Sequence, residues 1–184
     1  MTRTADRMLR RMDRAVTEWH LPVIGRAKGR VLRRLLARQR PRRAVEIGSL
    51  FGYSAILIAA GLARGGRLDC IEQNDYLAKF VAFNTAHAGL GRRVRVRVGD
   101  ALRLLPRLRG PVDFVLIDAR KEDYLRYLRA LEPRLTRGAV VVADNTGIFR
   151  RDVTPYLDHV RRGPYASREH DFGFDCMEVS IYRG

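Results

Sequence analysis

The sequence contains only two cysteines, Cys70 and Cys176, in 184 residues, which excludes a small domain held together by several disulfides. Both lie in apolar, strand-like surroundings, so we expect reduced thiols in the core. No apolar run approaches the roughly 20 residues of a membrane helix, since the nearest candidate, residues 44–63, contains Glu46 and several glycines. Residues 3–14 are charged and lack the apolar centre of a secretory signal. We therefore expect a cytoplasmic protein that does not enter a membrane.

Lysine is almost as scarce as cysteine, since Lys28, Lys79 and Lys121 are the only lysines in the chain. The formal net charge is nevertheless +16, so nearly all of the basic charge comes from arginine. An excess of this size favours a polyanionic partner such as nucleic acid. The arginines are spread along the whole chain, however, and a high arginine content is also common in proteins from GC-rich genomes. Two interpretations therefore stay open, a nucleic-acid surface and a compositional bias.

The pattern of apolar residues predicts one α/β domain over residues 1–184. Apolar residues at helical spacing predict helices at 3–19 and 25–38, interrupted by Pro22. Short apolar runs then predict strands at 44–47, 67–71, 94–98, 112–117 and 138–143, and helices fall between them near 53–63, 75–88, 101–108, 121–134 and 151–161. Such alternation is typical of a parallel sheet with helices on both faces. Around Gly173, two final strands without a helix between them predict an antiparallel pair at one edge.

The run A-V-E-I-G-S-L-F-G-Y-S at residues 44–54 ends a predicted strand and begins a helix. In an open α/β sheet, ligands bind beyond the carboxyl ends of the strands. Glycine lets the backbone approach a ligand closely, and the helix N-terminus favours a negative group. The next strand ends at Glu72, where an acid suits two ribose hydroxyls. The spacing is not G-x-G-x-x-G, so we favour a single nucleoside that carries a carboxylate, such as S-adenosylmethionine (SAM), over a dinucleotide, although such turns also use glycine for packing alone.

Polar residues end two further predicted strands. Asp118 ends one, with Lys121 three residues later, and Asp144 and Asn145 end the next. Neighbouring residues of a strand point to opposite faces, so Asp144 and Asn145 serve one site only if the strand breaks there. Carboxylate and amide oxygens suit a hard cation such as Mg²⁺. Each residue also has a structural alternative, as a helix cap or a turn residue, but their joint occurrence at neighbouring strand ends favours a metal site.

These motifs together resemble the metal-dependent O-methyltransferases of the catechol O-methyltransferase type. The resemblance rests on E-I-G-x-x-x-G-Y-S, the acid at Glu72, D-x-x-K-x-x-Y at 118–124 and A-D-N at 143–145. It extends from E-W at 18–19, through G-R-A-K-G at 25–29, to I-Y-R-G at the C-terminus. It implies a Rossmann-like, mostly parallel sheet of seven strands, with helices on both faces and an antiparallel last strand. The N-terminal helices, residues 1–40, would then cover the active site of a single SAM-dependent methyltransferase domain.

The resemblance also implies an activity and a role for each site residue. The enzyme would transfer a methyl group from SAM to a hydroxyl of a catechol-type small molecule, with Lys121 as general base. SAM would contact Glu46, Gly48, Ser54, Glu72, Asp100, Ala101 and Asp118. Mg²⁺, or another divalent cation, would be held by Asp118, Asp144 and Asn145. The methyl acceptor would contact Asn145, Glu169 and Trp19, with Glu169 binding its second hydroxyl and Trp19 forming an apolar wall.

Two departures from the family pattern concern the methyl acceptor. Ala119 and Arg120 stand where the catechol enzymes carry His and Trp, and no proline follows Asn145. Arg120 is a poor apolar wall and favours an acidic substrate, while Phe149 would cover the other side. The alternative activity is methylation of a hydroxylated tRNA base by the same machinery. A non-catalytic binding protein is a third interpretation, which the intact set of catalytic and metal-binding residues disfavours, and both a monomer and a homodimer stay open.

Overall fold

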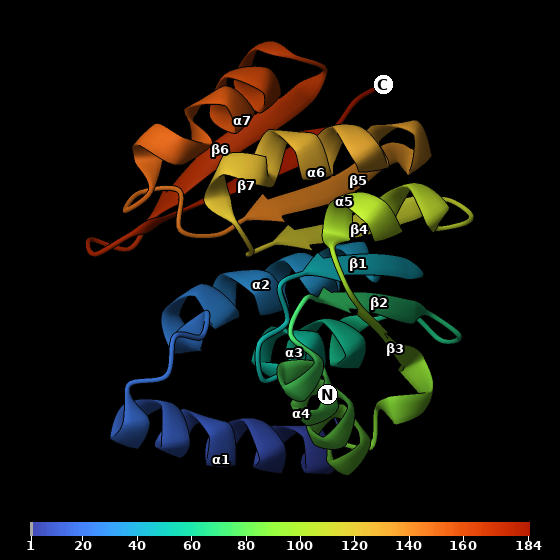
Figure 1. The fold of residues 1–184 in the computed structure, drawn as a ribbon, viewed down its shortest axis with the longest axis vertical. Coiled ribbons are helices and arrows are strands. Elements are labelled where there is room, and N and C mark those ends of the chain that lie inside the picture. Colours follow the sequence, from blue (N-terminus) through green and yellow to red (C-terminus); the bar gives the residue numbers. More distant parts are fainter. Residues whose placement is uncertain (1) are drawn as a thin grey trace.

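The computed structural model describes residues 2–184, and its centre is a seven-stranded sheet in the order β3-β2-β1-β4-β5-β7-β6 (Figure 1). The strands are β1 (Arg43–Ile47), β2 (Arg67–Glu72), β3 (Val94–Val98), β4 (Val112–Ile117), β5 (Leu135–Ala143), β6 (Tyr165–Asp171) and β7 (Cys176–Tyr182). The first five run parallel, whereas β7 is antiparallel to both of its neighbours. The predicted seven-stranded, mostly parallel sheet with an antiparallel last strand is confirmed.

The α-helices lie between the strands much as the sequence predicts. They are α1 (Arg3–Trp19), α2 (Gly25–Gln39), α3 (Tyr53–Gly61), α4 (Asp75–His87), α5 (Ala101–Leu104), α6 (Tyr124–Leu131) and α7 (Arg150–Arg162). The helix predicted at 121–134 is shorter than expected, because its first and last turns, Lys121–Asp123 and Glu132–Arg134, are 3₁₀ turns. Proline in the second of these turns prevents α6 from continuing.

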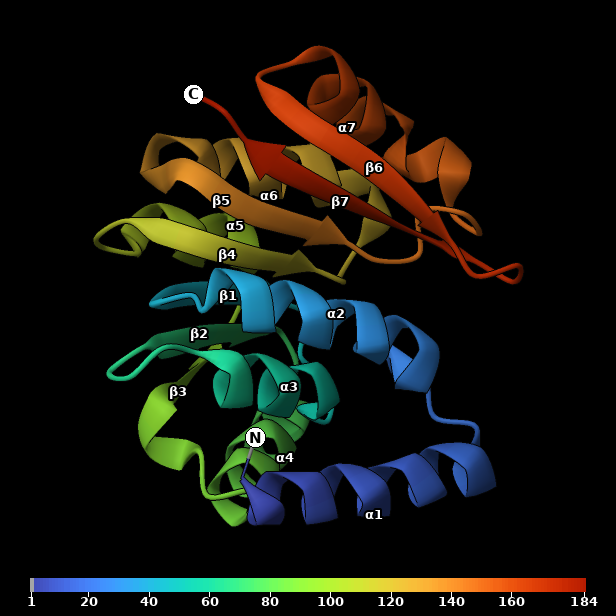
Figure 2. The ribbon, with the colours of Figure 1, turned by 180° about the vertical axis from the view of Figure 1, so that it is seen from behind.

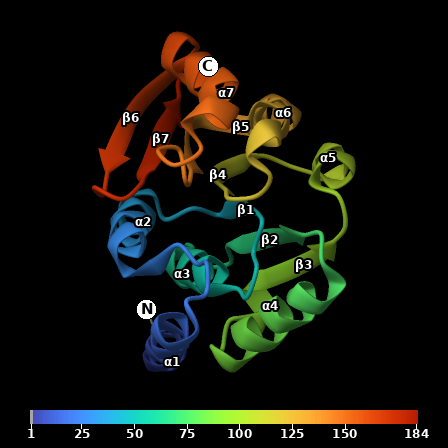
Figure 3. The same cartoon turned by 60° about the vertical axis from the view of Figure 1, so that its left-hand side comes forward.

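The helices cover both faces of the sheet. Helices α5, α6 and α7 lie in front of the strands in Figure 1, whereas α2 and α3 lie in front in the opposite view of Figure 2. Alternate residues of each strand supply the two cores: in β4, Phe114 and Leu116 face α2 and α3, while Val115 and Ile117 face the other helices. Helix α1 lies outside this arrangement, against α3 and α4 (Figure 3).

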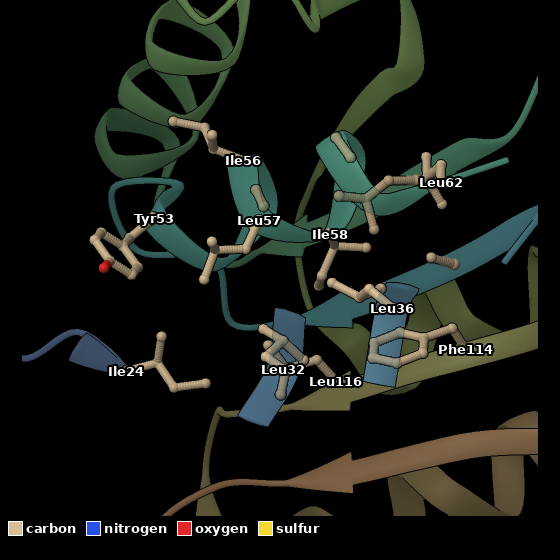
Figure 4. Close-up of a cluster of buried hydrophobic side chains, with 14 of the residues drawn as sticks. Ile24, Leu32, Leu36, Tyr53, Ile56, Leu57, Ile58, Leu62, Phe114 and Leu116 are labelled. Carbon is tan, nitrogen blue, oxygen red and sulfur yellow. The ribbon is translucent and has the colours of Figure 1, made fainter. Parts of the chain in front are cut away.

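Helices α2 and α3 share one apolar core with the strand β4. Leu32 and Leu36 of α2 lie between α3 and the side chains of Phe114 and Leu116 (Figure 4). All four side chains are at most 1% exposed. Burial of each such side chain stabilises the fold by about 1.5–3 kcal/mol. The strand ends that carry polar residues are therefore held on a rigid base.

One glycine brings the ends of β1 and β4 together. Gly48 follows β1 with a φ of +83°, a left-handed conformation that side chains with a Cβ rarely adopt. A Cβ atom here would also collide with the backbone carbonyl oxygen of Asp118, directly after β4. The amide of Asp118 in turn donates to the carbonyl of Ile47 (2.9 Å). Only glycine at position 48 therefore allows the backbone after β1 to lie this close to the backbone of Asp118.

The structure also bears on the expectations about cysteines and membranes. Cys70 is fully buried and Cys176 is partly buried, and neither forms a disulfide. The core location expected of Cys176 is therefore only partly correct, because Cys176 is the first residue of β7 and follows the exposed turn at 173–174. In residues 2–184 we find no helix with the length and apolarity that a bilayer crossing requires. The cytoplasmic location and the oligomeric state stay predictions.

Candidate active site

A cavity of about 470 Å³ opens at the carboxyl ends of the parallel strands. In Figure 1 these ends point to the left, the side on which the connection between α1 and α2 lies. The predicted site residues that line the cavity are Gly48, Ser54, Glu72, Asp100, Ala101, Asp118, Lys121, Asp144 and Asn145. From residues 1–40, the lining includes only Pro22, Val23 and Ile24 of the α1–α2 connection. Most of the predicted site therefore converges on one cavity.

Glu72 holds the glycine-rich turn between β1 and α3. Its Oε2 accepts the amides of Ser49 (3.1 Å) and Leu50 (3.0 Å), and its Oε1 accepts the amide of Asn74 (3.0 Å). These bonds support the left-handed backbone of Leu50, which has a φ of +47°. The carboxylate still faces the cavity, so it has acceptor capacity left for a ligand hydroxyl.

Glu46 lies beneath the same turn and outside the cavity lining. It is fully buried, and its Oε2 accepts the Ser49 hydroxyl (2.6 Å) and the Cys70 thiol (3.2 Å). Its Oε1 has no hydrogen-bond partner within residues 2–184. Burial raises the pKa of Glu46 to about 7, although the Ser49 hydroxyl bond favours the charged form. The structure thus gives Glu46 a role in holding the turn, and its contact with SAM stays a prediction.

The extended conformation of β5 ends before Asp144, as a shared site for Asp144 and Asn145 requires. Strand β5 ends at Ala143, and Asn145 has a φ of +58°. Asparagine is one of the few residues that adopt this left-handed conformation at little cost. As a result, the side chains of both Asp144 and Asn145 line the cavity.

Lys121 joins the two strand ends. Its ammonium donates to Asp118 Oδ1 (2.8 Å), Asn145 Oδ1 (2.9 Å) and the Tyr124 hydroxyl (2.8 Å). Tyr124 links Lys121 to the residue after β5, since its hydroxyl donates to the backbone carbonyl of Asp144 (3.0 Å). Tyr124 is a site residue that the sequence predictions do not include, although its place three residues after Lys121 in D-x-x-K-x-x-Y is a usable signal.

A second lysine, Lys28 of α2, lies behind the cavity. Its side chain is nearly inaccessible, and Nζ lies 2.5 Å from both Asp144 Oδ1 and Asp175 Oδ2. Burial alone would lower the pKa of Lys28, but the attraction of Asp144 and Asp175 outweighs it and raises that pKa. Burial and the nearby Asp118 charge raise the pKa of Asp144 to about 6, against the opposing effect of Lys28. Sequence reasoning assigned no function to either Lys28 or Asp175.

The oxygen atoms at these strand ends fit a hard cation. Lys121 already places a positive charge between Asp118 and Asn145, and Lys28 places another against Asp144. Two carboxylates and one amide oxygen are the donor types that Mg²⁺ prefers. Residues 2–184 contain no cluster of three His, Cys, Asp or Glu side chains arranged to hold a metal. That finding leaves the predicted set untested, because one of its three members is an asparagine.

Comparison with known proteins agrees with this geometry. Residues 4–162 match the sequence profile of the O-methyltransferase family. The chain belongs to this family. It is 40% identical over 119 residues to a catechol O-methyltransferase of Mycobacterium tuberculosis, which covers 64% of this chain and 54% of that protein. It is also 34% identical over 175 residues to the catechol O-methyltransferase of Sus scrofa, which covers 88% and 93% of the two chains.

Solved O-methyltransferase structures share the fold of this family member. The O-methyltransferase TomG of Streptomyces achromogenes, solved in complex with SAM, superposes with a TM-score of 0.84 at 28% identity, over 96% of this chain and 90% of TomG. An O-methyltransferase of Bacillus cereus, at 24% identity and a TM-score of 0.82, adds support for the fold alone. This chain spans only about half to two thirds of the first curated relatives, 54% of the M. tuberculosis enzyme and 65% of the Bos taurus enzyme.

Two residues predicted to contact the methyl acceptor lie away from the cavity. Trp19, the last residue of α1, is 69% exposed and does not belong to the lining. Glu169 of β6 also lies outside the lining, where it pairs with Arg150 (2.6 Å) and Arg161 (2.8 Å). Neither role is supported by these positions, and both stay predictions. The structure does bring Arg120 and Phe149 to the cavity, as the two departures from the family pattern suggested.

Proposed function

We propose that this protein is a Mg²⁺-dependent enzyme that transfers a methyl group from SAM to a hydroxyl of a catechol-type small molecule. The observation that supports this function most strongly is the meeting of Asp118, Lys121 and Asn145 in the cavity that the glycine-rich turn also lines. A nucleoside-binding turn, a candidate metal site and a candidate base thus share one chamber. Its volume of about 470 Å³ lies within the roughly 300–1,000 Å³ typical of small-molecule sites.

The cofactor would occupy the side of the cavity formed by β1, β2 and α5. Gly48 and Ser54 would bind its amino-acid part, and Glu72 its ribose hydroxyls. Asp100 and Ala101 begin α5 at the same cavity and would border the adenine. The likeness to TomG, which was solved with SAM, supports this assignment. Direct measurement of SAM binding by calorimetry tests this part separately from catalysis.

The acceptor would occupy the side formed by the ends of β4 and β5. Asp118, Asp144 and Asn145 would hold Mg²⁺, which when bound lowers the pKa of a phenol and fixes the position of its oxygen. Lys121, in its neutral form, would take the proton of the reacting hydroxyl. The oxygen then forms a bond to the methyl carbon as the carbon–sulfur bond breaks, which leaves a methyl ether and S-adenosylhomocysteine. The walls of the cavity would hold the reactants in line, an effect worth up to roughly 7–11 kcal/mol.

Arg120 indicates the chemical class of the acceptor. Its side chain lines the cavity directly before Lys121, and it makes no ion pair within residues 2–184. An unpaired guanidinium at this point binds a carboxylate in a two-pronged arrangement. We therefore favour catechols that carry an acidic group over neutral ones.

The net charge of +16 supports a second candidate, methylation of a hydroxylated tRNA base. That function requires a basic surface for the RNA, whereas Arg120 is the one arginine among the cavity-lining residues that the structure describes. The small-molecule function is therefore favoured. Transfer of labelled methyl groups to catechol, to a carboxylated catechol and to tRNA, measured side by side, distinguishes the two candidates.

A further inference from the structure

Asp175 is a buried carboxylate just outside the cavity, and its side-chain partners include Asn145 of the candidate metal site and Lys28 behind it. It directly precedes β7, and it is 4% exposed. Its Oδ1 accepts the backbone amides of Gly147 (3.1 Å) and Ile148 (3.0 Å). Its Oδ2 accepts Lys28 Nζ (2.5 Å) and Asn145 Nδ2 (2.9 Å). Both oxygens therefore bind the segment that follows β5 or the lysine that pairs with Asp144.

The bond from Asn145 to Asp175 fixes which atom of the amide faces the cavity. A carboxylate accepts hydrogen bonds and cannot donate them, so only the NH₂ group of Asn145 can face Asp175. The amide oxygen must then point the other way, where it accepts the ammonium of Lys121 (2.9 Å). A metal or a positive ligand group requires that same orientation, because the NH₂ group would repel it.

Lys28 completes this arrangement from α2. Its ammonium is the cation between Asp144 and Asp175, and both carboxylates are almost inaccessible to water. Burial of two like charges so close together requires a partner of opposite charge. Lys28 thus allows Asp144 to stay beside the cavity while Asp175 is held behind it. The segment fits tightly against β7, since a Cβ on Gly147 would lie 2.7 Å from the Cys176 amide nitrogen.

We propose that Asp175 and Lys28 are positioning residues that hold Asp144 and Asn145 with their oxygens toward the metal site. Neither lines the cavity, so each acts through its partner. The inference rests on the proposed function in one respect, namely that a divalent cation is bound there. Partners of this kind behind metal ligands typically change metal affinity by about 10–100-fold when they are removed.

The test uses Asp175→Asn in the full chain, with Mn²⁺ alone as the probe, titrated by electron paramagnetic resonance. We expect Mn²⁺ affinity to fall by about 10–100-fold while SAM affinity is retained. Hydrogen exchange supplies a second readout that needs no metal, because the amides of Gly147 and Ile148 should exchange faster in the variant. Asp113→Asn is the matched control, since Asp113 accepts the amides of Arg42 (2.8 Å) and Arg43 (2.9 Å) away from the site.

An exchanged pair separates positioning from mere stability. In Asp175→Asn combined with Asn145→Asp, donor and acceptor change places, and an oxygen ligand is retained at position 145. We expect this double variant to regain Mn²⁺ affinity relative to Asp175→Asn. Aspartate also tolerates the left-handed backbone of that position. If Asp175→Asn does not fold, the exchanged pair decides alone, and a folded pair that binds Mn²⁺ supports the inference.

Three results would overturn the inference. They are unchanged Mn²⁺ affinity in folded Asp175→Asn, unchanged exchange of Gly147 and Ile148, and an exchanged pair without recovered affinity. A wild-type protein that binds no Mn²⁺ and transfers no methyl group would instead overturn the proposed function. The hydrogen-exchange comparison would then still decide whether Asp175 holds the segment after β5.

Discussion

The ammonium of Lys121 lies 2.9 Å from the side-chain oxygen of Asn145, although the two residues are 24 positions apart in the sequence. The first follows β4 and the second follows β5, and these strands are parallel neighbours. The same ammonium bonds Asp118. A candidate base is therefore in direct contact with two of the three predicted metal ligands. Lys121 and a bound cation would contact the same two side chains.

Replacement of Lys121 by alanine should remove the proposed base. We expect kcat to fall by roughly 10²–10⁴-fold, the usual contribution of a general base. SAM binding should survive, because the cofactor would lie toward β1 and β2. Steady-state kinetics and calorimetry on the same preparation check both statements. The control is Lys79→Ala on exposed α4, and near-wild-type turnover of Lys121→Ala would remove Lys121 from the mechanism.

Asp144→Asn should abolish the response to Mg²⁺. The substitution retains the size of the side chain but removes the charge of a proposed ligand, while buried Lys28 still pairs with Asp175. The rate is measured against Mg²⁺ concentration at a temperature where the variant is folded. Exposed Asp152→Asn is the control, and an unaltered Mg²⁺ dependence would rule Asp144 out as a ligand.

Much of this site was readable from the sequence, because the relevant signals are local. Glu72 and Asp118 stand at the ends of apolar runs. The end of the strand at Asp144 is predictable too, because Asp144 and Asn145 can serve one site only if the strand stops there. Lys28 was overlooked even though it falls on the same helical stripe as Val31 and Leu32, where a buried lysine demands a partner. That partner, Asp175, is 147 positions away and looks like an ordinary turn residue.

The predicted acceptor contacts Trp19 and Glu169 lie on outer elements of the fold, α1 and β6, and outside the cavity lining. Glu169 lies on the edge strand β6, where its carboxylate pairs with Arg150 and Arg161 of α7. The role of Trp19 is implied by the family resemblance alone, and α1 packs against α3 and α4 in a way that leaves this last residue exposed. The positions of Trp19 and Glu169 cannot be predicted from the local sequence pattern, because they depend on how α1 and β6 pack against the rest of the domain.

Glu46→Gln should stabilise the protein above neutral pH. The fold raises the pKa of Glu46 from 4.5 to about 7, so the native state favours the neutral acid. The contribution of Glu46 to wild-type stability therefore falls as pH rises from 4.5 to 7, because the unfolded chain releases this proton first. The difference in free energy of unfolding between variant and wild type should therefore move in favour of the variant by roughly 3 kcal/mol across that window.

Denaturant unfolding of both proteins between pH 4 and 8 measures this difference, with exposed Glu122→Gln as the control. A constant difference over that range would show that Glu46 has no raised pKa. The sign of the trend is the sharper part of the prediction, because most carboxylates contribute stability as pH rises.

Arg120→Gln tests the proposed acidity of the acceptor. We expect KM for a dihydroxybenzoic acid to rise by about tenfold, as the loss of a charge-assisted hydrogen bond predicts. The KM for unsubstituted catechol should not change, nor should kcat for either compound. Arg92→Gln, an exposed arginine before β3, is the control. Equal effects on the two acceptors would show that Arg120 does not recognise the acid.

The most direct test of the central claim is methyl transfer from labelled SAM to catechol and to a dihydroxybenzoic acid, with Mg²⁺ and with EDTA. The account predicts a labelled methyl ether in the presence of Mg²⁺ and little or none with EDTA. Transfer that is equally fast in EDTA would contradict the metal site formed by Asp118, Asp144 and Asn145. Absence of transfer to either acceptor, by protein that demonstrably binds SAM, would contradict the assignment to catechol-type substrates.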